Sequence, residues 1–476
     1  MTSTTRFWKE RRDITPFLET GVISSERMRV VDRNACSLGI NALQLMENAG
    51  HALAKTVERF NPESVLVLSG PGNNGGDGMV AARLLQHTTD VTVCYYDSPK
   101  MTPSCRSQIA ALHTCAVTLV PFRCRDTLVA AETVFSHTDL IVDALLGTGT
   151  HGNLREPLSS CVRLANESGK PIISADIPTP GINPTVICAF HRAKDQGAEV
   201  YDIGIPVLAE IGTGPGDLLL IPERDQNAHK GDGGSILIIG GGPYQGAPYL
   251  AGMAALRAGA DIVRVATPVP LPFPDLIHLQ VSSPRITGDD QEHLIQSCQS
   301  ADVVVCGMGL GEGSHEVVRS LAPFCRKGVF DADALRNPLP QAAEDTLYTP
   351  HAGEFTRISG KNPGYGTLDR ATAILQAELP GTVLLKGKTD VISDGKRVRF
   401  NQTGDPAMTT GGTGDVLAGV CGAMMVHLSS FEAACVSAYA TGRAGEMVAA
   451  HTGPGLTAQD IIQVIPQILF RRIADE

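Results

Sequence analysis

The stretch Ser64 to Gln86 reads SVLVLSGPGNNGGDGMVAARLLQ and combines three signals in a fixed order. An aliphatic run, Ser64 to Leu68, predicts a strand, and Gly78 to Gln86 predicts a helix. Between them lies the glycine-rich loop Pro71 to Gly78. A strand joined to a helix by a short turn is typical of parallel sheets with crossover helices, so we expect an α/β fold.

The same alternation continues along both halves of the chain. The other elements predicted in the first half are the helices Leu43–Phe60 and Leu158–Asn166 and the strands Asp90–Tyr95, Asp139–Asp143, Pro171–Ala175 and Val200–Ile203. The polar segment PERDQNAHK, Pro222 to Lys230, is the best candidate linker, and the pattern restarts after it. The elements predicted in the second half are the strands Ser235–Ile239, Ile262–Ala266, Asp302–Cys306, Val329–Asp331 and Thr382–Lys386 and the helices Ala247–Ala258, Val416–Val426, Glu432–Ala450 and Ala458–Leu469. We therefore predict two α/β domains, residues 1–222 and 223–476.

The composition excludes several classes of protein. The 476 residues are 43% hydrophobic and 19% charged, which is ordinary for a folded protein and argues against disorder. With 50 acidic against 39 basic residues the formal net charge is -11, so we expect no nucleic acid or anionic membrane as a partner. The sequence shows no bilayer span and no signal peptide, and its 12 cysteines include no C-x-x-C pair. We expect a cytoplasmic protein that acts on small molecules and forms a homo-oligomer.

The loop Pro71 to Gly78 has the composition of a ligand-binding turn. Its four glycines let the backbone approach a ligand closely, and the helix that follows offers free N–H groups to a phosphate. Asn73 and Asn74 could supply oxygens to a cation, and Asp77 could hold a ribose hydroxyl. A tight strand-to-helix turn without a ligand is the alternative. Ligand binding is favoured because ligands bind at the carboxyl ends of parallel strands.

Two further aspartates end predicted strands of the first half. Asp143 leads into the loop GTGTHGN, Gly147 to Asn153, and Asp176 ends the run ISAD. Alone, either aspartate is explained as a helix cap or a turn former. The three strand ends are expected to converge along one edge of a parallel sheet. This convergence favours a site with a cation, a phosphate and an acid/base carboxylate.

The second half carries a glycine-rich run of its own, GGTGD, Gly411 to Asp415, directly before the helix predicted from Val416. Glycines at a helix N-terminus form an anion hole that stabilises a phosphoryl group in transfer, and Asp415 is placed to take a proton from a hydroxyl nucleophile. An N-terminal cap is the alternative role for Asp415. The segments Lys386–Asp390 and Asn401–Met408 are expected to complete a nucleotide pocket.

The ordered set of motifs resembles the bifunctional NAD(P)H-hydrate repair enzymes, which fuse an NAD(P)HX epimerase to an ADP-dependent NAD(P)HX dehydratase. The motifs of the first half are LMENAG (Leu45–Gly50), PGNNGGDG (Pro71–Gly78), DALLGTG (Asp143–Gly149), SADIP (Ser174–Pro178) and DIGIP (Asp202–Pro206). Those of the second half are KGDGGSILIIGG (Lys230–Gly241), GAPYLAGMAALRAGAD (Gly246–Asp261), GMGLG (Gly307–Gly311), DADAL (Asp331–Leu335), TPHAGEF (Thr349–Phe355), LLKGKTD (Leu384–Asp390) and GGTGD (Gly411–Asp415). The resemblance implies a three-layer Rossmann-like epimerase domain followed by a ribokinase-like dehydratase domain.

The resemblance also implies the residues of two sites. In the epimerase, NAD(P)HX would be contacted by Asn73, Asn74, Gly75, Gly76, Asp77, Gly147, Thr148, Gly149, Thr150, His151, Gly152, Asn153 and Asp176. Asp176 is our choice of acid/base, and a potassium ion would be held by Asn74, Asp143 and Thr179. In the dehydratase, NAD(P)HX would be contacted by Ala247, Gly309, His351 and Asp415, although a histidine in such a turn also has a purely structural explanation. ADP, with Mg²⁺, would be held by Lys386, Gly387, Lys388, Thr389, Asp390, Gly412, Thr413 and Gly414.

The implied chemistry is phosphorylation followed by elimination. Asp415 would deprotonate the hydroxyl of the hydrated nicotinamide ring, which attacks the terminal phosphate of ADP and yields NAD(P)H, AMP and phosphate. The epimerase would interconvert the R and S hydrates for an S-specific dehydratase. After SADIP the chain departs from the family, because Thr179–Pro184 stands where a Ser-Gly-Leu-Asp run is usual. The alternatives are a ribokinase-like small-molecule kinase with an accessory domain, and a first half that is a non-catalytic scaffold.

Overall fold

The structure, a computed structural model, describes residues 14–129, 132–147, 154–225 and 227–470. These residues form two compact units. The N-terminal unit is Thr20–Ala209, and the C-terminal unit combines residues 14–19 with residues 210–470. None of the helices in the described part of the chain has both the length and the apolar character needed to cross a bilayer.

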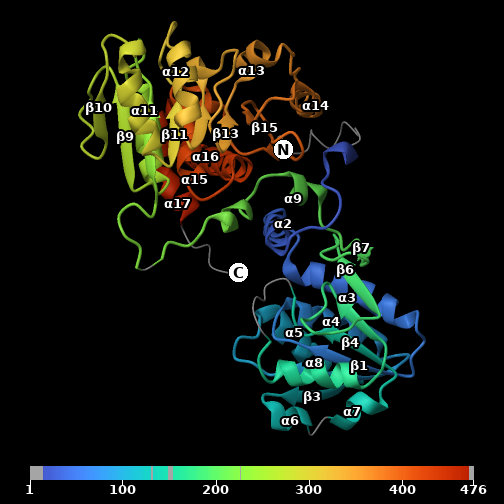
Figure 1. The fold of residues 1–476 in the computed structure, drawn as a ribbon. Helices are drawn as coiled ribbons and strands as arrows, with labels where there is room; N and C mark the ends of the chain where they lie inside the picture. Colours follow the sequence, from blue (N-terminus) through green and yellow to red (C-terminus); the bar gives the residue numbers. More distant parts are fainter. Residues whose placement is uncertain (1–13, 130–131, 148–153, 226, 471–476) are drawn as a thin grey trace. The chain divides into compact units, whose positions relative to one another are not determined.

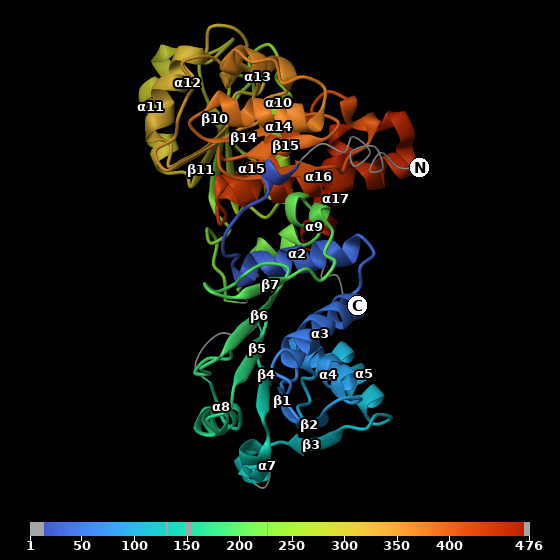
Figure 2. The ribbon, with the colours of Figure 1, turned by 90° about the vertical axis from the view of Figure 1, so that its right-hand side faces the viewer.

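The N-terminal unit is built on a parallel sheet of seven strands in the order β3-β2-β1-β4-β5-β6-β7 (Figures 1 and 2). The strands are β1 (Ser64–Ser69), β2 (Asp90–Tyr96), β3 (Thr118–Phe122), β4 (Leu140–Ala144), β5 (Ile172–Ala175), β6 (Val186–Phe190) and β7 (Glu199–Tyr201). Because β1, β4 and β5 are neighbours, their carboxyl ends lie side by side. The convergence predicted from the sequence is therefore confirmed.

Helices cover both faces of this sheet, since side chains that alternate along each strand are buried on both sides. Val65 and Val67 belong to the apolar core on one face, and Leu66 and Leu68 belong to the core on the other. The helices of the first face are α2 (Ser25–Ser37), α3 (Ala42–Glu58), α4 (Asn73–Leu85) and α5 (Pro103–Leu112). Those of the second face are α6 (Arg125–Val129), α7 (Glu132–His137) and α8 (Leu158–Glu167).

The C-terminal unit contains a nine-stranded sheet in the order β10-β9-β8-β11-β12-β13-β14-β15-β16. The strands are β8 (Ser235–Ile239), β9 (Ile262–Thr267), β10 (Ile277–Gln280), β11 (Val303–Cys306), β12 (Lys327–Phe330), β13 (Asp345–Tyr348), β14 (Thr382–Leu385), β15 (Asp390–Ser393) and β16 (Val398–Asn401). The strands from β10 to β14 are parallel, and the last two pair in antiparallel fashion.

One large apolar core joins this sheet to four helices of the C-terminal unit. These helices are α10 (Ala247–Arg257), α15 (Thr413–Met425), α16 (Ser430–Thr452) and α17 (Ala458–Leu469). The other helices of at least seven residues in the described part of this unit are α11 (Gln291–Gln299), α12 (His315–Leu321), α13 (Ala352–Ser359) and α14 (Thr367–Ala377).

The edge strand β16 receives two segments that lie far away in sequence. Phe17, in a short 3₁₀ turn, packs edge-on against Phe400 with 6.2 Å between ring centroids, and Glu19 forms an ion pair with Arg399. In the segment that follows the N-terminal unit, the Thr213 hydroxyl donates a hydrogen bond to Asn401 Oδ1 at 2.8 Å. The chain therefore leaves the C-terminal unit after residue 19 and re-enters it at residue 210, ahead of the predicted linker Pro222–Lys230.

Most of the predicted strands and helices are present, but both glycine-rich runs differ from their predicted form. α4 begins at Asn73, five residues before Gly78, and α15 begins at Thr413, three residues before Val416. Gly75, Gly76 and Gly414 therefore lie in the first turn of a helix. In addition, α2, β3 and β6 are elements that the sequence patterns did not predict.

Candidate functional site

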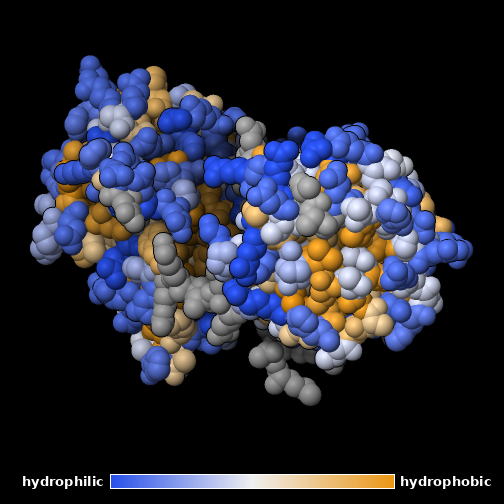
Figure 3. All heavy atoms as spheres, turned by 90° about the horizontal axis from the view of Figure 1, so that it is seen from below, coloured by the Kyte–Doolittle hydropathy of each residue, from blue (hydrophilic) through white to orange (hydrophobic). Residues whose placement is uncertain are grey.

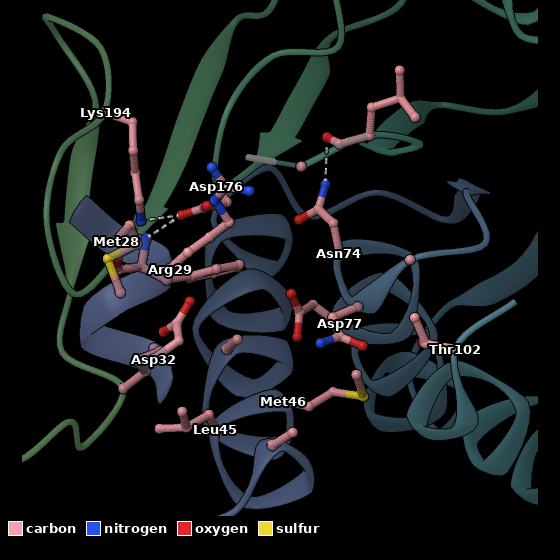
Figure 4. Close-up of a pocket in the computed structure, with 18 of the residues that line it drawn as sticks. Met28, Arg29, Asp32, Leu45, Met46, Asn74, Asp77, Thr102, Asp176 and Lys194 are labelled. Carbon is pink, nitrogen blue, oxygen red and sulfur yellow. Dashed lines mark hydrogen bonds and ion pairs between the residues drawn. The ribbon is translucent and has the colours of Figure 1, made fainter. Parts of the chain in front are cut away.

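The N-terminal unit holds a cavity of about 570 Å³ at the carboxyl ends of β1, β4 and β5 (Figure 4). Its walls come from the start of α4, from the segments after β4 and β5, and from α2 and α3. The predicted site residues that line it are Asn73, Asn74, Asp77, Gly147 and Asp176. The predicted residues Thr148, Gly149, Thr150, His151, Gly152 and Asn153 lie outside the described residues.

Three carboxyl groups face this cavity, those of Asp32 on α2, Asp77 on α4 and Asp176 after β5. Burial raises the pKa of Asp32 to about 6; the charge of Asp176 adds to this effect, while Lys194 opposes it. Burial, followed by the charges of Asp176 and Asp32, raises the pKa of Asp77 well above its usual value. Carboxyl groups perturbed in this way in a concave site are typical of acid/base catalysis.

Asp176 is fixed in place by its surroundings. Its backbone has φ of 62°, a left-handed conformation that is uncommon outside glycine. Its Oδ1 accepts hydrogen bonds from Lys194 Nζ at 2.5 Å and from the Phe190 N–H at 3.1 Å. Lys194 is almost completely buried and also donates to the Phe190 carbonyl at 2.6 Å. An aspartate held in a strained backbone by a buried lysine is well suited to a fixed role in catalysis.

The three residues predicted to hold potassium are brought together beside this cavity. Asp143 is fully buried, and its carboxylate accepts hydrogen bonds from the Thr179 hydroxyl at 2.7 Å and the Thr179 N–H at 2.9 Å. Asn74 Nδ2 donates to the Leu146 carbonyl at 2.9 Å. Asn74 Oδ1 is buried and has no hydrogen-bond partner among the described residues. The Leu146 N–H donates to Thr179 Oγ1 at 3.2 Å, so Leu146 joins Asn74 to the Asp143–Thr179 pair. A buried amide oxygen without a donor fits a cation with oxygen ligands.

The glycines of the first run serve packing more than ligand approach. A Cβ on Gly75 would lie 2.0 Å from the Gly70 carbonyl oxygen, and one on Gly76 would lie 2.4 Å from Met46 Cε. Both glycines are buried, and neither lines the cavity. Only Gly72 faces open space. Gly75 and Gly76 therefore let α4 lie against the end of β1 and against α3. Their contact with the substrate stays a prediction.

Several cavity residues were missed in the sequence. They are the basic residues Arg29, Arg33, Lys100 and Lys194 and the acidic residue Asp32. Most of them lie on α2 or in segments without a recognised motif. No local sequence pattern therefore distinguishes them from ordinary charged surface residues. The available signal was the amphipathic character of Ser25–Ser37, whose buried positions include Met28 and Val31.

The C-terminal unit brings three charged residues together at the carboxyl ends of β12 and β14 and the start of α15. Lys386 Nζ donates to Asp331 Oδ1 at 2.8 Å, and Asp331 is almost fully buried. Burial and the nearby charge of Asp331 raise the pKa of Asp415 to about 7, although Lys386 opposes the shift. Asp415 can therefore accept a proton near neutral pH.

The N-terminus of α15 is open to an anion. Its N-cap residue is Gly412, with φ of 94°, and no side chain caps the helix. Asp415 forms no hydrogen bond with a described residue, so the cap predicted as its alternative role is absent. A Cβ on Gly414 would lie 3.4 Å from Lys386 Nζ, which places the ammonium beside the free N–H groups. Together they form the anion hole expected from GGTGD.

Other predicted residues of this unit have structural roles in the described chain. His351 caps α13, since its Nδ1 accepts from the Gly353 and Glu354 N–H groups at 3.0 and 3.2 Å. Asp390 accepts hydrogen bonds from the Gly387 N–H and from Asn401 Nδ2, both at 2.9 Å, and so closes the loop of Gly387, Lys388 and Thr389. The Thr413 hydroxyl donates to the Met408 carbonyl at 2.8 Å.

Two predicted substrate contacts of this unit lie near neighbouring strand ends. Ala247 is the first residue of α10, which follows β8, and Gly309 follows β11 with φ of 69°. A Cβ on Gly309 would lie 2.4 Å from the Tyr244 carbonyl oxygen, so glycine is required there. Because β8, β11 and β12 are adjacent, these residues share one sheet edge with Asp331.

The chain matches two protein-family models. The model described as YjeF-related protein N-terminus matches residues 42–185, and that described as NAD(P)H-hydrate dehydratase matches residues 236–467. The bifunctional NAD(P)H-hydrate repair enzyme Nnr of Methanospirillum hungatei is 59% identical over 459 residues, which cover 96% of both chains. The chain belongs to the bifunctional NAD(P)H-hydrate repair enzymes.

A second bifunctional NAD(P)H-hydrate repair enzyme shares less of the sequence. That of Archaeoglobus fulgidus is 38% identical over 478 residues, covering 94% of this chain and 98% of its own. A solved structure that resembles this chain is the crystal structure of the ADP/ATP-dependent NAD(P)H-hydrate dehydratase from Bacillus subtilis, co-crystallized with ATP and Mg²⁺. Its sequence is 25% identical, and the TM-score is 0.48. The match covers 54% of this chain and 97% of the dehydratase chain. The resemblance drawn from the motifs is thus confirmed, as is the α/β class with a Rossmann-like and then a ribokinase-like domain.

Part of the cavity lies outside residues 42–185, the region that the YjeF-related model matches. The match over residues 42–185 includes Asn74, Asp77 and Asp176 but neither Asp32 nor Lys194. The side chains that flank the matched region therefore complete the wall of the cavity from α2 and from the segment after β6.

Proposed function

We propose that the N-terminal unit interconverts R- and S-NAD(P)HX and that the C-terminal unit dehydrates S-NAD(P)HX to NAD(P)H with ADP, releasing AMP and phosphate. The observation that carries this proposal is the arrangement of Asp415. Its carboxyl group has a pKa of about 7 and lies at an uncapped helix N-terminus beside Lys386. A proton acceptor next to an anion hole is what phosphorylation of a hydroxyl group requires.

In the dehydratase reaction, Asp415 accepts the proton of the ring hydroxyl as that oxygen attacks the terminal phosphate of ADP. Lys386 and the N–H groups that open α15 stabilise the charge on the transferring phosphoryl group, and AMP leaves. The lone pair of the ring nitrogen then expels phosphate from the neighbouring carbon. Loss of a proton from the adjacent ring carbon restores the double bond of NAD(P)H.

Magnesium would accompany the nucleotide in this unit. Within the part of the chain that the structure describes, no group of three or more His, Cys, Asp or Glu side chains could hold a metal ion. A bound Mg²⁺ would then take most of its ligands from the phosphates of the nucleotide and from water, as is usual for this ion. The ion supplies positive charge to the transferring phosphoryl group when it is bound.

In the epimerase unit, Asp176 acts as an acid/base group for the substrate, and Asn74, Asp143 and Thr179 hold K⁺. The unpartnered Asn74 Oδ1 supports this assignment. Bound potassium supplies a positive charge beside the substrate. Arg29, Arg33 and Lys100 line the same cavity, and these cations suit the phosphates of a dinucleotide although the whole chain is acidic.

The cysteines support a cytoplasmic location. All 12 are free, and most are buried. Many buried thiols without a disulfide are typical of a reducing compartment.

The test uses the purified full-length chain and separated R- and S-NADHX. With ADP, S-NADHX should regain the absorbance of NADH, and AMP should form in equal amount; ATP is compared in a parallel reaction. R-NADHX should be cleared only after conversion to the S form. Phosphorylation of a vitamin alcohol or a sugar without recovery of NADH would instead support the small-molecule kinase and refute the dehydratase.

A further inference from the structure

The substrate chemistry sets a requirement that Asp176 alone does not meet. The R and S forms of NAD(P)HX differ in the face of the ring that carries the hydroxyl, on the carbon next to the ring nitrogen. Exchange of this hydroxyl between faces needs one group that protonates the leaving oxygen and a second that takes a proton from water on the other side. A carboxylate held at one position serves one face.

Asp32 is a cavity carboxyl that no motif of the sequence assigns. It lies on α2, near Arg29 and Arg33, which also line the cavity. It forms no hydrogen bond or ion pair with a described residue. Figure 4 shows its carboxyl group pointing from α2 into the cavity, apart from Asp77, which enters from α4. Asp32 is therefore free to contact a ligand.

Asp32 and Asp176 differ in their contacts. Asp176 is paired with the buried ammonium of Lys194 at 2.5 Å. Asp32 has no such partner, and burial raises its pKa to about 6. A carboxyl group without a charged partner and a carboxylate held by a lysine, both facing one cavity, are suited to act as acid and base. Asp77 also faces the cavity, and burial raises its pKa well above the usual value.

We propose that Asp32 is the general acid of the epimerase and that Asp176 is its basic partner on the opposite face of the ring. This inference rests on the proposed epimerase function of the N-terminal unit. It adds a catalytic residue from α2, outside the region that matches the family model.

The proposed step balances in atoms and charge. Asp32 donates its proton to the ring hydroxyl, the C–O bond breaks, and one water leaves while the nitrogen lone pair forms a C=N bond. A second water then adds to the carbon from the other face and gives a proton to Asp176, as the electrons of the C=N bond return to nitrogen. Proton exchange with solvent restores both carboxyl groups.

The experiment follows R-NADHX to S-NADHX by chiral chromatography, with the full-length chain and without ADP, so that the dehydratase removes no product. Asp32→Asn keeps the size of the side chain and removes the acid, so kcat should fall at least about 100-fold while KM changes little. Asp32→Glu should recover part of the rate. Glu26→Gln, an equivalent change at an exposed position of the same helix, should leave the rate unchanged.

Two further measurements identify the role of Asp32. Since the acid must be protonated, wild-type kcat/KM should fall as the pH rises through the pKa of Asp32, and this limb should be absent in Asp32→Asn. The ionisable groups that face Asp32 are Arg29, Arg33, Cys36, Asp77, Asp176, His191 and Lys194. In water enriched in oxygen-18, wild-type turnover should place the label in the product hydroxyl.

The outcomes separate this inference from the function on which it rests. If the wild-type chain does not epimerise R-NADHX, the proposed function of the N-terminal unit fails. If the wild type is active and Asp32→Asn matches it, the proposed function stands and the role of Asp32 is refuted. Equal losses in Asp32→Asn and Asp32→Glu, together with a lowered melting temperature, would also refute it, because they indicate a structural role. Epimerisation without incorporation of the label would overturn the proposed C–O cleavage.

Discussion

The substitution Asp331→Asn separates the two causes of the raised pKa of Asp415. That pKa is raised from 3.8 to about 7, mainly by burial and next by the charge of Asp331. The whole shift corresponds to roughly 4 kcal/mol against the charged carboxylate. Removing the charge of Asp331 should lower the pKa of Asp415 by about one unit, or ~1.4 kcal/mol. The effect is reinforced because Lys386, released from its 2.8 Å contact with Asp331, becomes available to Asp415.

The sign follows from the role of Asp415 as a base. Dehydration requires its unprotonated form, so kcat/KM rises with pH through its pKa and is half-maximal near pH 7 in the wild type. In Asp331→Asn the midpoint should move down by about one pH unit. The plateau at high pH should also fall several-fold, because a weaker base accepts the proton less readily.

The assay records NADH formation from S-NADHX and saturating ADP across the pH range. Asp289→Asn, which removes the same charge from an exposed position of the C-terminal unit, is the matched control and should leave the profile unchanged. A midpoint that stays in place or moves up in Asp331→Asn would refute the assignment of Asp415 as the base whose pKa Asp331 sets.

Three other substitutions test separate parts of the structure. Asp415→Asn should abolish NADH formation from S-NADHX while R-to-S epimerisation measured without ADP keeps its wild-type rate; loss of both activities would contradict independent sites. Asn74→Ala should remove the rise in melting temperature that K⁺ gives the wild type over tetramethylammonium, because it removes the unpartnered oxygen; an undiminished K⁺ effect would exclude Asn74 as a ligand. Gly75→Ala should destabilise the N-terminal unit by about 1–3 kcal/mol in urea unfolding, since its Cβ would lie 2.0 Å from a backbone oxygen. Gly72→Ala, where the Cβ meets open space, is the control, and equal stability of the two variants would show that α4 moves freely away from β1.

The sequence predicted the strand-end residues well because their placement follows from topology. Asp143 and Asp176 each follow a run of aliphatic residues, and parallel strands carry such residues to one edge of the sheet. GGTGD likewise marks a helix start through its glycines, so the anion hole beside Lys386 was foreseeable. Family motifs supplied the reaction, which local patterns alone do not distinguish from that of a kinase.

The sequence could not predict what long-range packing determines. Asp32 and Lys194 reach the cavity only because α2 packs on the sheet and because the segment after β6 turns back toward Asp176. The packing role of Gly75 and Gly76 depends on the Gly70 carbonyl and on Met46, whose positions the sequence does not give. The pKa of Asp415 is raised by burial and by the charge of Asp331, which lies 84 residues earlier in the chain.

The docking of residues 14–19 on β16 has a consequence for synthesis of the protein. Glu19 and Arg399 are 380 residues apart, so at ribosomal rates Arg399 emerges roughly 20–80 s after Glu19. During that interval the whole of Thr20–Ala209 has left the ribosome and can fold, while Phe17 has no aromatic partner. The N-terminal unit can thus fold first on the nascent chain. The C-terminal unit is complete only when β16, one of its last strands, packs against residues 14–19.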